Sequence, residues 1–78
     1  MQELRDRVRK LLDETGIKQV DIVREINGQG LYRADTAELC NAIKGKLTSP
    51  KANRMVADAY SILTREQAKQ IRQKLRKL

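Results

Sequence analysis

The chain has 78 residues, with 17 Lys and Arg against 10 Asp and Glu, a formal net charge of +7, one Cys and no His. A chain this short can build only one small core. Because His is the commonest general base and metal ligand, its absence disfavours enzymes and metal sites. We therefore expect one non-enzymatic domain with no cofactor, no metal and no small-molecule substrate.

The N-terminal part of the chain predicts two helices. An apolar stripe at spacings of four, three and one predicts the first, which should end at Gly16; the stripe is Leu4, Val8, Leu11 and Leu12. The second is predicted from about Lys18 to Ile26, with its end at Asn27 and Gly28. The side chains expected to be buried on it are Val20, Ile22, Val23 and Ile26.

Residues 27–34 (NGQGLYRA) contain two glycines and are predicted to be irregular, with Leu31 and Tyr32 against the core. Asp35 then precedes Glu38 by three positions, the spacing of a capping box. A third helix should begin there and end at Gly45. Its inner side is expected to be Ala37, Leu39, Cys40, Ala42 and Ile43. Cys40 is thus predicted to be a buried structural thiol.

Two further helix starts are predicted. Ser49 before Pro50 combines a capping hydroxyl with a residue suited to the first turn, and the apolar face that follows is Ala52, Met55, Val56, Ala59 and Tyr60. Thr64 with Gln67 repeats the capping-box spacing and opens a fifth helix with the stripe Ala68, Ile71, Leu75 and Leu78. The expected fold is an all-α compact bundle of about five short helices.

The charge is unevenly distributed. Residues 1–63 carry 11 basic and 9 acidic side chains, whereas residues 64–78 carry 6 and 1. We expect a domain over 1–63, with 64–78 as a basic amphipathic C-terminal helix of the same single domain. Such an excess of cations favours polyanions. This helix has three possible roles: pairing with a second copy, packing on its own domain, or contacting DNA phosphates.

The sequence also bears on location. No apolar run approaches the ~20 residues that span a bilayer, and residues 1–12 are charged throughout, unlike a signal peptide. A single thiol cannot form an internal disulfide. We therefore expect a cytoplasmic protein that does not bind membranes.

Three motifs lie between Ile17 and Pro50: the opening IKQVDIV with Gln19 near its start, the helix TAELCNAIKG, and the exit KGKLTSP. Together they resemble the lambda-repressor-like (Cro/C1-type) helix-turn-helix family of phage and bacterial regulators, over about residues 4–63. One departure is the 13 positions from Ile26 to Leu39, about twice what the compact turn of the family needs. Either the turn is lengthened, or these are simply adjacent helices of a bundle.

The resemblance implies a sequence-specific double-stranded DNA-binding transcriptional regulator, such as a phage or prophage repressor. Members of the family usually bind as homodimers, with recognition helices about 34 Å apart. Base edges would be read by Thr36, Ala37, Glu38, Asn41 and Lys44. Phosphates would be bound by Lys18, Gln19, Arg33, Lys46, Thr48, Ser49 and Lys51. Glu38 has a second possible role, as a capping partner only.

Two other functions remain open. One is a non-enzymatic protein-interaction module, an antirepressor or adaptor, on the same helical scaffold. The other is an RNA-binding or membrane-surface role for the basic tail, against which the scarcity of aromatic residues counts.

Overall fold

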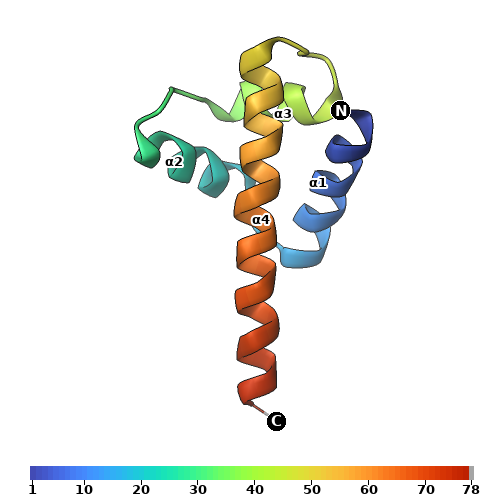
Figure 1. Ribbon diagram of the computed structural model, residues 1–78, viewed down its shortest axis with the longest axis vertical. Coiled ribbons are helices and arrows are strands. Elements are labelled where there is room, and N and C mark those ends of the chain that lie inside the picture. Colours follow the sequence, from blue (N-terminus) through green and yellow to red (C-terminus); the bar gives the residue numbers. More distant parts are fainter. Residues whose placement is uncertain (78) are drawn as a thin grey trace.

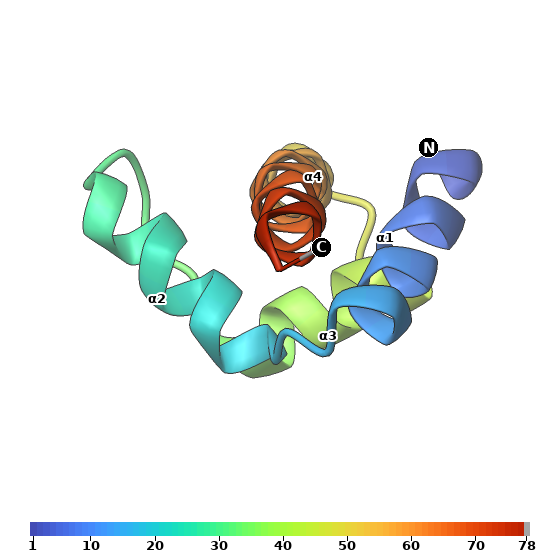
Figure 2. The same cartoon turned by 90° about the horizontal axis from the view of Figure 1, so that it is seen from below.

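The computed structural model describes residues 1–77, which form four α-helices. These are α1 (Gln2–Thr15), α2 (Gln19–Gln29), α3 (Thr36–Lys44) and α4 (Pro50–Arg76). Figure 1 shows α4 flanked by α1 and α2, and Figure 2 shows α3 crossing beneath α4 to complete a three-helix cradle. The all-α prediction is confirmed. The expectation of about five helices is wrong, because the last two expected helices are one continuous helix.

The hydrophobic core lies where α4 rests in this cradle. Every helix contributes to it, and its largest fully buried side chains are Ile22, Ile26, Leu39, Met55, Leu63, Val8 and Val56. On α1 the predicted stripe is confirmed, since Val8 and Leu11 are buried while Leu4 and Leu12 pack against the cluster. No polar or charged side chain is buried among the described residues. Aliphatic packing is therefore the main source of stability.

The predicted starts of α3 and α4 are confirmed by their caps. Asp35 Oδ1 accepts the Glu38 backbone N–H at 2.7 Å, and Ser49 Oγ accepts the Ala52 backbone N–H at 3.2 Å. The capping box at Asp35 is only half formed, because the Glu38 carboxylate binds Lys51 Nζ at 3.0 Å. The predicted helix ends at Gly16 and Gly45 are also confirmed.

The end of α2 lies further along the chain than Asn27 and Gly28, so that prediction is wrong. Gly28 is helical, and α2 ends at Gly30, whose φ of 74° is in the left-handed region that favours glycine. The side chain of Asn27 points instead at Ala34: its Oδ1 accepts the Ala34 N–H at 2.8 Å and its Nδ2 donates to the Ala34 carbonyl at 3.0 Å. The irregular connection therefore covers only residues 30–35.

Tyr32 fastens this connection to α4. Its hydroxyl donates to Asp58 Oδ2 at 2.6 Å, and the Arg54 guanidinium lies 4.8 Å from its ring centroid. Burial, and then the hydrogen bond to Asp58, raise the pKa of Tyr32 well above its ordinary value. The prediction that Tyr32 packs against the core is confirmed. The same prediction is wrong for Leu31, which is 65% exposed in the bend just before Tyr32.

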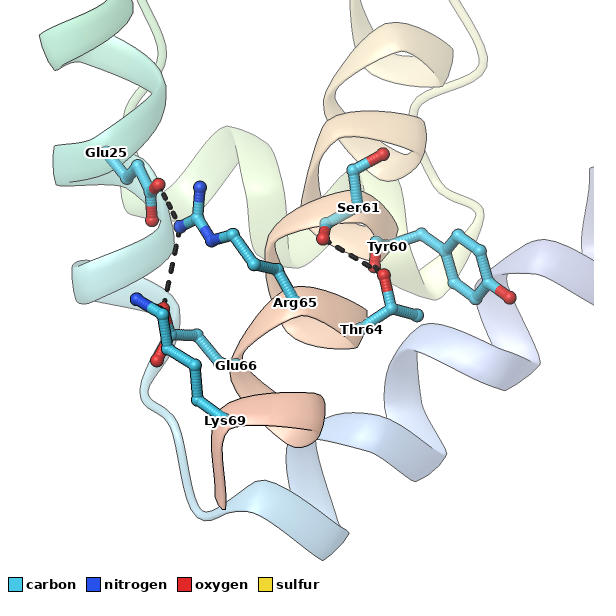
Figure 3. Close-up of polar contacts among 7 residues, drawn as sticks. All are labelled: Glu25, Tyr60, Ser61, Thr64, Arg65, Glu66 and Lys69. Carbon is cyan, nitrogen blue, oxygen red and sulfur yellow. Dashed lines mark hydrogen bonds and ion pairs between the residues drawn. The ribbon is translucent and has the colours of Figure 1, made fainter. Parts of the chain in front are cut away.

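The expected break at Thr64 is absent because its hydroxyl bonds backward within α4. It donates to the carbonyls of Tyr60 and Ser61 at 2.9 and 3.0 Å, as Figure 3 shows, so the helix is not capped anew. We call residues 64–76 the C-terminal arm. Its first turns are held on both sides of α4: Arg65 pairs with Glu25 of α2, and on α1 Gln67 binds Glu14 and Gln70 binds the Thr15 carbonyl.

Several residues expected to be buried are not. Val20 is 45% exposed, Ala37 is exposed and Cys40 is half-buried. The core sides of the two helices are formed instead by Ile22, Val23 and Ile26 on α2 and by Leu39, Ala42 and Ile43 on α3. On the arm, Ile71 and Leu75 are 53% and 62% exposed. This apolar stripe therefore does not pack on its own domain; Leu78, its last predicted member, lies outside the described residues.

Candidate nucleic-acid interface

A groove of about 780 Å³ runs between the C-terminal end of α1, the N-terminal end of α2 and the outer side of α3. We call it the α3 groove. Helix α3 lines it with Thr36, Cys40, Ile43 and Lys44; the segment that enters α2 contributes Ile17, Lys18, Gln19 and Val20; and α1 contributes Arg9, Leu12 and Asp13. Figure 2 shows the end of α1 and the start of α2 meeting close to α3.

The helical repeat explains which side of α3 faces the groove. Thr36, Cys40 and Lys44 are four residues apart, so they follow one another along one side of the helix. The buried residues Leu39, Ala42 and Ile43 follow on the adjoining side of the helix, and Ile43, three residues from Cys40, also reaches the groove. The groove side therefore presents a hydroxyl, a thiol and an ammonium group.

The predicted base-reading residues divide into two groups. Thr36 and Lys44 line the α3 groove, and Ala37 is exposed beside them. Asn41 is half-buried, and its backbone carbonyl accepts the N–H groups of Lys46 and Leu47 at 2.9 and 3.3 Å, where the helix ends. Glu38 lies on the α4 side, where Lys51 holds its carboxylate. For Glu38 to read a base, this ion pair would have to open.

The start of α2 has no side-chain cap, and its first turn also carries the carboxylate of Asp21. Its N-cap residue is Lys18, whose backbone is extended. The first backbone N–H groups of a helix lack an intrahelical acceptor, and they attract phosphate together with the helix dipole. Gln19 is half-buried, and its Oε1 is buried without a hydrogen-bond partner among the described residues. Both Lys18 and Gln19 line the α3 groove, and their role as phosphate contacts stays a prediction.

The other predicted phosphate contacts lie outside the α3 groove. Lys46 and Thr48 are exposed on the loop between α3 and α4, whereas Ser49 is used as the α4 cap. Lys51 is paired with Glu38, and Arg33 is exposed on the connection before α3. The structure thus brings Lys18 and Gln19 together with α3, and leaves these five as a flanking set.

No family model, curated protein or solved structure matches this chain. In residues 1–77 no helix is both long and apolar enough to cross a membrane. The same part of the chain has no cluster of three or more side chains suited to holding a metal ion.

Seven lining residues were not predicted from the sequence as part of this site: Arg9, Leu12, Asp13, Ile17, Val20, Cys40 and Ile43. The four-residue spacing from Thr36 through Cys40 to Lys44 could have identified Cys40. Nothing in the sequence placed the end of α1 beside α3, because that contact depends on how both helices pack on α4. Arg9 and Asp13 carry opposite charges, and Arg9 is already held by Asp6 at 2.8 Å, so the positive charge of the groove comes from Lys18 and Lys44.

Proposed function

We propose that this protein is a sequence-specific double-stranded DNA-binding regulator of transcription that inserts α3 into the major groove. The observation that carries the proposal is the sharing of one groove by the polar side of α3 and the uncapped start of α2. The former offers side chains that can read bases, and the latter offers donors for phosphate. A phage or prophage repressor acting on an operator in the cytoplasm is the form of regulator that we favour.

The chemistry of base reading follows from the side chains. The major groove is wide enough for one α-helix and shows a different pattern of donors and acceptors for each base pair. The Lys44 ammonium can donate to guanine, the Thr36 methyl can contact thymine, and the Asn41 amide can pair with adenine. Thr36 and Lys44 lie on the groove side, whereas Asn41 lies further round the helix, so we rank it third.

The phosphate contacts would set the register of the protein on DNA. Lys18 and the uncapped N–H groups at the start of α2 lie at one edge of the α3 groove. Lys46 and Thr48 follow the C-terminal end of α3 and are exposed. A helix held at both ends by phosphates is positioned against the bases without any contribution to sequence preference.

A matched pair of lysines tests this proposal. Lys44 lines the α3 groove, whereas Lys46 lies two residues further on, outside it; both are exposed. With duplexes selected from a random pool, Lys44→Ala should reduce discrimination at about one base pair by roughly 1–3 kcal/mol. Lys46→Ala should weaken all sequences alike and reduce the slope of log affinity against log salt by about 1.

Two outcomes would contradict the proposal. A uniform loss for both variants would mean that α3 does not read bases. Wild-type protein without any sequence preference at about 0.15 M salt would mean that binding is only electrostatic. Unfolding curves for both variants serve as the control, since neither exposed lysine should affect stability by more than about 0.5 kcal/mol.

A second function is favoured by the exposure of Ile71 and Leu75 on the C-terminal arm. Two large apolar residues one turn apart are typical of a helix that docks on another protein, either a second copy or an adaptor partner. The double variant Ile71→Gln, Leu75→Gln should leave DNA binding intact if DNA is the main ligand of a monomer. A shift in mass by light scattering would identify pairing with a second copy.

A further inference from the structure

The C-terminal arm has an unusual charge pattern for a helix that ends in solvent. Residues 67–77, which include most of the arm and the residue after it, carry five basic side chains and no acidic one. Lys69 pairs with Glu66 at 3.3 Å, but within residues 1–77 no acidic side chain pairs with Arg72, Lys74, Arg76 or Lys77. Like charges at such spacings repel one another along a helix. An anionic ligand bound to the arm would reduce this repulsion.

Four residues of the arm form a defined hollow. Lys69, Arg72, Gln73 and Arg76 line a depression of about 220 Å³, and their spacings of three, four and seven place them on one side of α4. Two guanidinium groups, an ammonium and an amide thus line one shallow, open depression. Guanidinium groups bind phosphate oxygens through paired hydrogen bonds, and an ammonium adds a compact charge.

The direction of the arm is fixed by contacts at its base. Arg65 binds Glu25 of α2 on one side, and on the other side Gln67 binds Glu14 of α1 at 2.8 Å. Gln70 adds a hydrogen bond to the Thr15 carbonyl at 3.1 Å. Figure 3 shows the Arg65 side chain reaching from α4 to α2 between Glu25 and Glu66. These contacts set the direction in which α4 leaves the cradle, and the basic hollow follows them on the same helix.

The position of the arm relates it to DNA held at α3. Figure 2 looks nearly along α4 and shows α3 from its side, so α3 runs across α4. The major groove winds around the duplex axis, so a helix lying in it also crosses that axis. A duplex bound at α3 would therefore extend along α4. Figure 1 shows the arm projecting in that direction, past the connection between α1 and α2.

We propose that the C-terminal arm is a second DNA contact, in which Lys69, Arg72, Gln73 and Arg76 bind the phosphodiester backbone beside the site of α3. This proposal rests on the proposed function and extends it. The arm of residues 64–76 is ~20 Å long at 1.5 Å per residue. At 3.4 Å per base pair this length corresponds to about six base pairs. The arm would not distinguish DNA sequences, because it contacts phosphates only. It would lengthen the footprint to one side of α3.

The test compares two double variants that remove the same charge. Arg72→Gln with Arg76→Gln removes two cations of the hollow. The control, Arg7→Gln with Arg24→Gln, removes two exposed cations from α1 and α2 that belong to neither proposed contact. Binding is measured over a range of salt on a short duplex that ends at the base pairs covered by α3, and on one longer by about ten base pairs, one helical turn, at each end.

On the long duplex, the arm variant should lose about tenfold or more in affinity at 0.1 M salt, and its salt slope should fall by about 2 relative to wild type. The control should lose clearly less. On the short duplex the two variants should behave alike, and wild type should gain affinity from the added length. Sequence preference should be the same for wild type and both variants.

Four results would overturn the arm contact. Equal losses for both variants on the long duplex, or no gain in wild-type affinity with duplex length, would exclude a DNA contact of the arm. Either result would leave base reading by α3 intact. Loss of all sequence preference in wild type would instead end the proposed function, and the arm contact with it. Binding of wild type to phosphatidylserine vesicles that Arg72→Gln with Arg76→Gln abolishes, without any effect of duplex length, would assign the arm to a membrane surface.

Discussion

The two halves of α4 share one uninterrupted helix but differ completely in burial. Residues 50–63 bury six side chains, from Ala52 to Leu63, whereas in the arm no described side chain is buried. Both halves carry apolar residues at helical spacing. In the first half these face the cradle of α1, α2 and α3, and in the second half Ile71 and Leu75 face solvent.

This difference shows that helix formation and burial have separate causes. The chain stays helical through Thr64 because no residue there stops it and because α1 and α2 hold the next turns by Gln67, Gln70 and Arg65. Burial ends at Leu63 because α1 and α2 provide no further apolar surface beyond it. An apolar stripe therefore predicts a helix without predicting what covers it.

The largest expected effect comes from replacing one leucine in each half of α4 and comparing the free energies of unfolding. Leu63 is fully buried and Leu75 is 62% exposed. Leu63→Ala should lower the free energy of unfolding by about 2–5 kcal/mol, since it leaves a cavity, whereas Leu75→Ala should change it by no more than about 0.5 kcal/mol. Urea unfolding followed by circular dichroism measures both. A comparable loss for Leu75→Ala would show that the arm is packed in solution.

A smaller effect is expected at the C-terminal end of α2, which the sequence placed too early. Gly30 has a φ of 74°, and Gly28 is helical with no atom within 4 Å of an added Cβ. Gly30→Ala should destabilise the fold by about 1 kcal/mol or more, and Gly28→Ala should stabilise it by roughly 0.5–1 kcal/mol. Thermal unfolding of the two variants gives the signs. The opposite signs would place the end of α2 at Gly28.

The smallest expected effect concerns the contact between α2 and the base of the arm. Arg65 pairs with Glu25 and Glu66, while no acidic side chain within residues 1–77 pairs with Arg72. The hydrogen bond to Glu25 raises the pKa of Arg65. Because the pair is largely exposed, Arg65→Ala should lower the free energy of unfolding only slightly, and less at high salt. Arg72→Ala should cost nothing measurable. Equal effects would show that the Arg65 contact contributes no stability.

Much of the fold could be predicted because its signals are local. Asp35 and Ser49 cap the helices that follow them, and the stripe on α1 identifies its buried side. The end of α2 could not be found, because the amide of Asn27 bonds to Ala34 across the connection rather than ending the helix. The capping box expected at Thr64 failed because its hydroxyl found carbonyl acceptors in the preceding turn.

Only the parts of the candidate site on α3 and at the start of α2 were predicted from the sequence. Thr36 and Lys44 on α3, with Lys18 and Gln19, do share one groove. The engagement of Glu38 by Lys51 depends on how α3 meets α4, and the contribution of Arg9 and Asp13 depends on the position of α1. Both are tertiary contacts, which residue spacing does not report.

The most direct test of DNA reading by α3 uses the thiol that the α3 groove already contains. Cys40 lies between Thr36 and Lys44 on the groove side and is half-buried, and it is the only cysteine in the chain. The rate of its alkylation by a small maleimide should fall at least about tenfold when a preferred duplex is bound, since DNA in the groove would exclude the reagent. An unchanged rate under conditions of saturated DNA binding would show that DNA lies elsewhere, and would contradict the reading role of α3.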